Sequence, residues 1–403
     1  MDEPTIGERD GIRLMNPLVN PRSIDGSNRP HRILEAVQAM APLIAERRGE
    51  FDADRRLPDA VFAAMADAGL FRLWLPQSLG GPELSPLQFL DVVEAASTLD
   101  GSVGWLVGNG GGMSRIGGYI PEPVAREWFA DRHTFVASST GAIGSAIAVE
   151  GGYRVAGRWP FGSGAHHASH FMVLASNPEV PESPVICCYL DRKDVTVLDN
   201  WYVSGLRGTG SCDLEAHDIF VPAARAHLFI GLRPTQEGLL YRMPPVSVFS
   251  WSICGVPLGI AAGAMRSFVD VASRKGRLGV SGLLRDRETT HAIVGRMKAT
   301  LRAARAGLCE AMKDLMDATQ SGDGLTDARA NLRTATAHAA EVSVCVTDML
   351  ATTAGAVAIF ETCPLERAVR DVHAAVKHIA MSPNYYAVAG RLALGLDPGT
   401  ARF

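Results

Sequence analysis

The sequence predicts an α+β fold in three parts: a helical part, a compact β part and a long helical part. Three observations predict this order. Apolar residues recur at three- and four-residue intervals early in the chain, and the middle is rich in Val, Gly, Thr, Ser and aromatic residues. The remainder is rich in alanine and returns to helical spacing. We expect an N-terminal arm at 1–30, a helical domain at 31–130, a central β domain at 131–235 and a C-terminal helical domain at 236–403.

The first helical part follows a lead-in of roughly 28 residues, rich in Pro, Asn and Arg, that we expect to be disordered. Helical spacing is clear at Ile33, Val37 and Met40. Pro58 and Pro76 disfavour helix in the residues that precede them, so each marks an expected boundary.

Four segments of the middle part are dense in β-branched and aromatic residues, which is typical of strands. In the last part, glycine-containing interruptions near 276–282 and 321–324 predict breaks between helices. The expected strands are 153–161, 171–176, 185–190 and 195–199.

Charge and composition exclude several classes of partner. The chain has 39 basic and 43 acidic residues and no basic run, so we expect neither nucleic acid nor a membrane surface as a partner. We see no apolar run of membrane-spanning length and no secretory signal. The seven cysteines form no C-x-x-C pair, which predicts reduced thiols, a cytoplasmic location and no zinc site.

Three histidines, His166, His167 and His170, lie close together near an expected strand. Their spacing could suit a metal. No cysteine or carboxylate partner accompanies them, so we predict no metal site.

The most informative segment begins at Cys363 and reads C-P-L-E-R-A-V-R-D-V-H-A-A-V-K-H-I-A-M-S-P. The run Pro364–Asp371 resembles the closing helix of the acyl-CoA dehydrogenase superfamily. The dehydrogenases commonly carry a catalytic Glu two turns later, where this chain has His378 and Ile379. Isoleucine cannot remove a proton. The segment therefore resembles the branch of two-component flavin monooxygenases, and this resemblance makes His378 the expected catalytic residue.

One face of the expected helix carries Arg367, Asp371, Ala374, Ala375 and His378, at spacings of three and four residues along the face. Pro383 limits the helix, which places His378 near its last turn, where the helix dipole favours imidazolium. We expect a cationic His378 that supplies a proton to reduced-oxygen species or exchanges one with a phenolic substrate. A capping or core histidine is the alternative. We expect Arg367 and Asp371 to form a structural ion pair.

Two motifs in the middle part resemble flavin-contacting elements of the same branch. W-P-F-G-S-G at 159–164 is similar to its W-x-F-x-S-G element, and G-L-R-G-T-G-S at 205–211 precedes D-I-F-V-P. The resemblance implies that Trp159, Phe161 and Ser163 line the isoalloxazine ring. A core Trp at the end of a strand is the alternative.

Four further residues are assigned by the same resemblance. Ser139 aligns with a threonine whose hydroxyl touches flavin, and Arg274 resembles an arginine that meets the flavin phosphates, often from a neighbouring subunit. Trp105 and Asn109 lie in a glycine-rich helical stretch and are candidate substrate-binding residues. A close helix crossing explains those glycines equally well.

The resemblance implies an N-terminal helical domain, a central β-barrel-like domain and a C-terminal four-helix bundle. It also implies that reduced FMN or FAD and O2 form a C4a-hydroperoxyflavin, which hydroxylates an aromatic or polycyclic small molecule. No G-x-G-x-x-G follows a strand, so we expect a separate NAD(P)H:flavin reductase. We also expect a homotetramer, because flavin sites of this superfamily are completed across subunits.

Two other functions remain open from the residues. In an acyl-CoA dehydrogenase with a relocated base, Asp270 or Glu288 could supply the carboxylate. A non-catalytic flavin-binding scaffold is the second, because a fold alone does not fix function.

Overall fold

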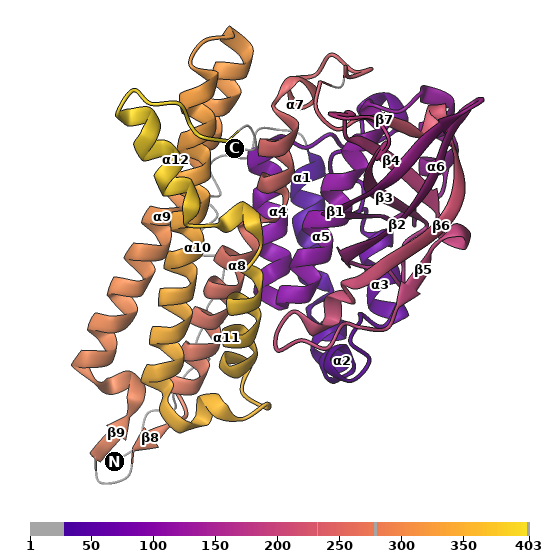
Figure 1. The fold of residues 1–403 in the computed structure, drawn as a ribbon. Coiled ribbons are helices and arrows are strands. Elements are labelled where there is room, and N and C mark those ends of the chain that lie inside the picture. The colour runs from indigo at the N-terminus through magenta and orange to yellow at the C-terminus, as the bar shows by residue number, and fades with distance from the viewer. Residues whose placement is uncertain (1–27, 232, 278–279, 401–403) are drawn as a thin grey trace, which may run out of the picture.

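The computed structural model describes residues 28–231, 233–277 and 280–400, with helices at both ends of the chain and strands between them (Figure 1). The expected arm at 1–30 lies outside the described residues, except for its last three residues, which open the first helix.

The N-terminal helical part ends at residue 130, and its helices begin where local signals predict. Pro58 precedes α3. Ser85 forms a capping box with Gln88 at the start of α4. The Asp100 side chain caps α5 by accepting a hydrogen bond from the Ser102 N–H at 2.8 Å. The helices are α1 (Asn28–Ala39), α2 (Ala41–Ala53), α3 (Asp59–Asp67), α4 (Pro86–Leu99), α5 (Gly101–Met113), the short η3 (Ser114–Gly118) and α6 (Glu122–Ala130).

The central part is one mixed seven-stranded sheet in the order β5-β6-β2-β1-β3-β4-β7. β1 and β3 pair in parallel, and the other pairs are antiparallel. All four expected strand segments are confirmed. The barrel-like domain expected from the resemblance is an open sheet, with β5 and β7 at its edges among the described residues. The strands are β1 (Val136–Val149), β2 (Gly152–Gly162), β3 (His170–Ser176), β4 (Ile186–Asp191), β5 (Thr196–Leu198), β6 (Cys212–Pro222) and β7 (Ala226–Leu228).

The C-terminal part is helical and breaks where the glycines predict. A hairpin of β8 (Gly276–Arg277) and β9 (Val280–Leu283) follows α8, and Gly322 and Gly324 adopt positive φ between α9 and α10. Helices α8 to α11 lie side by side, with α4 and α5 between them and the sheet (Figure 1). The helices are α7 (Leu239–Arg242), α8 (Pro245–Ala272), α9 (Glu288–Ser321), α10 (Leu325–Ala354), α11 (Pro364–Ala375) and α12 (Asn384–Ala393).

Two described helical segments, 245–272 and 325–359, are long and apolar enough to cross a membrane. We expected no apolar segment of membrane-spanning length, and by length and composition that expectation is wrong. The apolar window of α8 is 83% buried inside the protein, as in a core helix, whereas that of the second segment is 33% buried.

The glycines of α5 allow helix backbones to approach one another closely. A Cβ on Gly104 would lie 1.8 Å from the Ser97 Oγ of α4, and one on Gly108 would lie 2.3 Å from the Ser252 carbonyl oxygen of α8. Both contacts are shorter than any real Cβ contact. The close helix crossing therefore accounts for these glycines.

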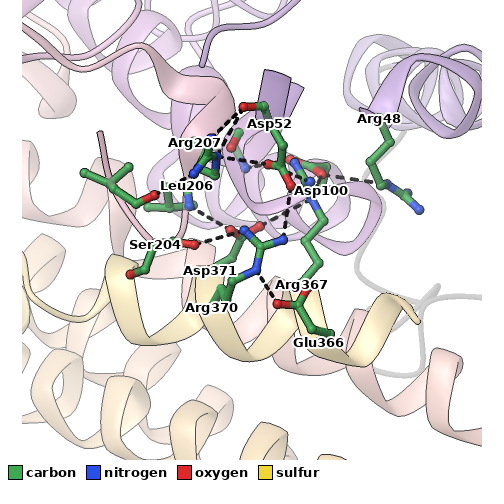
Figure 2. A network of polar contacts seen from close by, with 12 residues as sticks. Arg48, Asp52, Asp100, Ser204, Leu206, Arg207, Glu366, Arg367, Arg370 and Asp371 are labelled. Carbon is green, nitrogen blue, oxygen red and sulfur yellow. Dashed lines mark hydrogen bonds and ion pairs between the residues drawn. The ribbon is translucent and has the colours of Figure 1, made fainter. Parts of the chain in front are cut away.

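A buried polar network joins α11 to the N-terminal helices (Figure 2). The Arg367 Nε lies 2.7 Å from Asp100 Oδ2, and its Nη1 lies 3.0 Å from Asp52 Oδ1 in α2. Asp371 Oδ1 accepts the Leu206 N–H at 2.7 Å, which fixes the loop before the short helix η5 (Arg207–Thr209). Three carboxylates thus surround one nearly buried guanidinium.

The Arg367–Asp371 ion pair exists, but it is long, at 3.8 Å. The shorter partners of Arg367 are Asp100 and Asp52. Burial, and then the Asp100 charge, raise the pKa of Asp371 to about 7, while Arg367 opposes this rise. Both residues are structural, as expected. Asp371 acts mainly as the acceptor for the loop, and Arg367 holds the helix junction.

The α5 crossing gives a stability test. In Gly108→Ala the new Cβ must displace α8 backbone, so we expect a loss of about 1–3 kcal/mol in the free energy of unfolding. Gly295→Ala in α9 is the matched control, because nothing lies within 4 Å of its Cβ position. That variant should gain up to about 1 kcal/mol. Urea denaturation measures both, and equal stability of Gly108→Ala and wild type would contradict the close crossing.

Candidate functional site

Three of the predicted site residues come together from distant parts of the chain. The Trp105 Nε1–H of α5 donates to the Ser163 Oγ, which follows β2, at 3.0 Å. The Trp105 ring meets the His378 ring edge-on, with centroids 5.7 Å apart and an interplanar angle of 68°. The site therefore lies where α5, the sheet and the segment after α11 meet.

A chain of hydroxyl groups connects the two glycine-rich motifs. The Ser163 Oγ lies 2.8 Å from the Ser211 Oγ, which lies 2.7 Å from the Thr209 Oγ1. Thr209 in turn donates to the Leu206 carbonyl at 2.8 Å. An indole N–H can only donate and a carbonyl can only accept, so all the protons between them point from Trp105 toward Leu206. Ser163 keeps a lone pair but has no free O–H.

His378 does not lie on α11, which ends at Ala375. It caps the short helix η9 (Ile379–Met381), where its Nδ1 accepts the Ala380 N–H at 3.1 Å, so a neutral ring carries its hydrogen on Nε2. Burial, and then the Arg333 charge, lower the pKa of His378 to about 4. The expected imidazolium is therefore wrong, because desolvation and a nearby cation outweigh a helix dipole.

Arg333 of α10 was not predicted as a site residue. Only 1% of it is exposed, and its guanidinium donates to the Ser250 hydroxyl and, at 3.4 Å, to the Val246 carbonyl. It also lies over the Tyr385 ring, 4.7 Å from the centroid. An arginine within an alanine-rich helical run is a weak signal of such a role in the sequence.

The residues of the W-P-F-G-S-G motif face different ways. Trp159 has no exposed surface, and its Nε1–H donates to the Leu174 carbonyl at 2.8 Å, so it cannot touch a flavin in this conformation. Phe161 is 63% exposed and lies edge-on to Trp201. Its φ of 64° breaks the alternation that would otherwise place both rings on one face. The packing of Trp159 thus favours the core alternative.

Two other predicted residues lie apart from Trp105. Ser139 is buried on β1, and its hydroxyl donates to the Pro160 carbonyl, beside Phe161. Arg274 is exposed in the connection between α8 and β8, and the β8–β9 hairpin lies at the end of the bundle away from the sheet (Figure 1). One copy of the chain does not bring Arg274 to the other candidates.

Asn109 borders a pocket with about 90 Å³ of space accessible to water, between α5, η3, the sheet and the start of α8. Its walls are largely apolar and include Met113, Met172 and Phe249. The Asn109 Nδ2 donates to the Trp105 carbonyl at 2.9 Å. The pocket therefore begins one helical turn from the indole that contacts Ser163 and His378.

The carboxylates of the dehydrogenase alternative do not reach this site. Asp270 and Glu288 are both exposed, and none of the residues that line the pocket is acidic. Glu94 is a buried carboxylate whose pKa burial raises to about 7, but the Arg305 Nε holds it at 2.7 Å. Among the residues that the structure describes, no cluster of three or more His, Cys, Asp or Glu side chains could hold a metal ion.

Comparisons with known proteins agree with this geometry. Residues 32–131 match the family model of the acyl-CoA dehydrogenase N-terminal domain, and residues 251–383 match that of the C-terminal domain. The indole-3-acetate monooxygenase of Pseudomonas putida is 30% identical over 87% of this chain and 91% of its own.

Two further relatives cover almost the whole chain. The oxygenase subunit HsaA of a flavin-dependent monooxygenase from Mycobacterium tuberculosis is 29% identical over 91% of this chain and 96% of its own. The structure of XiaF from Streptomyces in complex with FADH2 and glycerol superimposes with a TM-score of 0.85 at 26% identity, covering 93% of this chain and 98% of XiaF.

The scaffold, the converging tryptophan, serine and histidine, and these relatives agree. The chain belongs to the acyl-CoA dehydrogenase superfamily, in the branch of two-component flavin-dependent monooxygenases.

Proposed function

We propose that this chain is the oxygenase component of a two-component system that hydroxylates an aromatic small molecule. A separate NAD(P)H:flavin reductase supplies reduced FMN or FAD, and O2 is the co-substrate. A bound reduced flavin would supply the chemistry for activation of O2 and for transfer of one oxygen atom to the substrate. The observation that carries the proposal is the meeting of Trp105, Ser163 and His378, without the carboxylate base of a dehydrogenase. A free-thiol state of all seven cysteines fits a cytoplasmic location.

The order of protons in the hydroxyl chain supports a preference for the reduced flavin. Reduced isoalloxazine carries a hydrogen on N5, whereas the oxidised ring has only a lone pair there. Ser163 offers a lone pair and no free O–H, so it matches the N–H of the reduced ring. The residues therefore fit reduced flavin better than oxidised flavin.

We assign the remaining predicted residues by where they lie. The exposed Phe161 ring and the Trp105 indole provide flat apolar surfaces for the isoalloxazine. Ser139 holds the Pro160 carbonyl and so positions the Phe161 backbone, while Trp159 supports the strand from the core. Arg274 would meet the flavin phosphates of another copy, because it is exposed between α8 and β8 and contacts none of the other candidates in one copy.

His378 acts as a neutral hydrogen-bond donor through Nε2 in this proposal. A neutral imidazole holds an oxygen atom at a fixed place without protonating it, which limits release of that oxygen as peroxide. The apolar pocket beside Asn109, one helical turn from Trp105, holds the substrate ring.

The hydroxyl chain gives a binding test. In Ser211→Ala the Ser163 O–H loses its acceptor and becomes free to donate to oxidised N5. We expect the affinity ratio of reduced over oxidised flavin to fall by about three- to tenfold, the worth of one net hydrogen bond. Anaerobic titration with both redox states measures the ratio. Ser343→Ala removes a buried hydroxyl of α10 and is the control. An unchanged ratio in Ser211→Ala would refute this proton order.

The role of His378 gives a catalytic test. With reduced flavin, O2 and a panel that includes indole-3-acetate and resorcinol, His378→Ala should still consume O2. Product per O2 should fall about tenfold or more, and H2O2 should rise to match. His373→Ala is the control, because this exposed histidine of α11 pairs with Asp348. Equal product yield in both variants would remove His378 from the mechanism.

The same histidine sets an expectation for pH. Its pKa of about 4 leaves it neutral between about pH 5.5 and 8, so the wild-type yield should show no His378 inflection in that range. The folded-state pKa lies below the unfolded value. This group therefore contributes stability above about pH 6.5 that is lost as pH falls through about 4. An NMR titration of the His378 ring checks the value.

The outer face of α10 supports a homotetramer. The apolar segment 325–359 is only 33% buried in one copy, and Cys345 and Met349 are exposed on it. Ile359 at its end is 74% exposed, and Phe360 directly after it is 58% exposed. Contiguous exposed apolar surface of this kind is typical of subunit interfaces. Sedimentation velocity should give four times the chain mass, and a monomer would contradict the assembly.

A further inference from the structure

Arg115 of η3 lines the pocket that Asn109 borders, and only 8% of it is exposed. Its Nε and Nη2 donate to the Leu240 carbonyl at 3.2 and 2.8 Å. Nη2 also approaches the carbonyls of Tyr241 and Met243, at 3.4 and 3.3 Å. None of these hydrogen bonds uses Nη1.

The charge of Arg115 has no counter-ion. Among the described residues, none of its hydrogen-bond partners is a carboxylate, and no acidic side chain lines the pocket. Burial lowers the pKa of Arg115, with Tyr119 and Tyr241 opposing, but a guanidinium stays protonated in proteins. Carbonyl oxygens satisfy the N–H groups without cancelling the charge. The Tyr119 ring, whose centroid lies 4.7 Å from the guanidinium carbon, stabilises the charge in part, but a desolvated charge without a counter-ion is costly.

The tyrosine and histidine side chains of the pocket are neutral and already paired, whereas the Trp74 Nε1–H has no hydrogen-bond partner. The Tyr189 hydroxyl lies 2.7 Å from the His227 Nε2, and the His227 Nδ1 lies 2.9 Å from the Leu228 carbonyl. A carbonyl can only accept, so His227 carries its hydrogen on Nδ1 and accepts the Tyr189 hydroxyl hydrogen. The Tyr119 hydroxyl donates to the Tyr241 carbonyl at 3.0 Å. Among the residues that the structure describes, Arg115 is therefore the one charged side chain that lines the pocket.

We propose that this pocket binds an aromatic carboxylate whose anionic group lies against Arg115 and whose ring packs between the apolar walls. A planar carboxylate suits a guanidinium with a free nitrogen, and the walls offer Met113, Met172 and Phe249 to the ring. The inference rests on the proposed function, in which the same pocket holds the substrate for hydroxylation.

Asn109 and Arg115 constrain how this substrate lies. Both border the pocket and are six residues apart, which is roughly 9 Å along a helix, and Trp105 lies one further turn before Asn109. A carboxylate held at Arg115 leaves the aromatic ring on the Asn109 side of the pocket. The substrate class is therefore an aromatic acid.

Binding to the full-length chain without flavin tests the charge preference. The probes are 2-naphthoate and 2-naphthamide, which have nearly the same shape but differ in charge, and isothermal titration calorimetry gives both dissociation constants. We expect the wild type to bind 2-naphthoate at least about tenfold more tightly. Equal or tighter binding of the amide would overturn the proposal, and so would a failure to bind either probe.

Variants assign the preference to Arg115. Arg115→Gln should lose at least about tenfold in affinity for 2-naphthoate while its affinity for 2-naphthamide changes little, and Arg115→Lys should keep most of the preference. Arg126→Gln in α6, which removes an exposed arginine paired with Glu122, is the control. If a folded Arg115→Gln protein loses affinity for 2-naphthoate and 2-naphthamide equally, Arg115 only stabilises the segment 240–243 and does not bind the carboxylate. If these variants fail to fold, the ratio of the wild-type dissociation constants for 2-naphthoate and 2-naphthamide still tests the proposal.

Flavin binding and O2 consumption measured without any aromatic probe test the proposed function separately. A protein that consumes O2 with reduced flavin but prefers the amide contradicts the carboxylate inference and leaves the monooxygenase function standing.

Discussion

The burial of one guanidinium among three carboxylates constrains how the three parts of this protein meet. Asp100 binds Arg367 with one oxygen and caps α5 with the other, so one carboxylate fixes both the start of the helix that carries Trp105 and the position of α11. Asp371 fixes the loop that leads to Thr209 and Ser211. A charge left alone in this place would cost several kcal/mol, roughly 3–5, so the junction admits a single register.

That junction places the site in a dry and crowded region. The glycines of α5 bring α4 and α8 close enough for the Trp105 indole to sit between the sheet and the segment after α11. Exclusion of water there keeps His378 neutral. It also strengthens the electrostatic interactions of the buried Arg333 and Arg115 charges with the groups around them. The low polarity of the helical interface is thus part of the chemistry as well as of the stability.

The comparison with the dehydrogenases shows how one scaffold changes reaction. Their resemblance to this chain extends along Pro364–Asp371, and in this protein Arg367 of that segment pairs with Asp52 and Asp100 and so holds α11 against the N-terminal helices. We propose that the change of function lies a few residues on, at His378 and Ile379, and in a hydroxyl chain in which Ser163 donates its proton to Ser211. Fold and reaction are therefore set by different residues of the same segments.

The sequence by itself determined the α–β–α order, the four strand segments and the breaks near 276–282 and 321–324, because these depend on local periodicity and glycine content. It also pointed to Trp105, Ser163 and His378 through their motifs. Tertiary structure decided the charge of His378, which depends on desolvation and on Arg333, 45 positions away in the chain. It also decided, through the positive φ of Phe161, that the Phe161 ring is exposed and the Trp159 ring is buried. The placement of Arg115 at the pocket is a third result of the tertiary structure. Burial and long-range charge are properties of packing, so no local pattern encodes them.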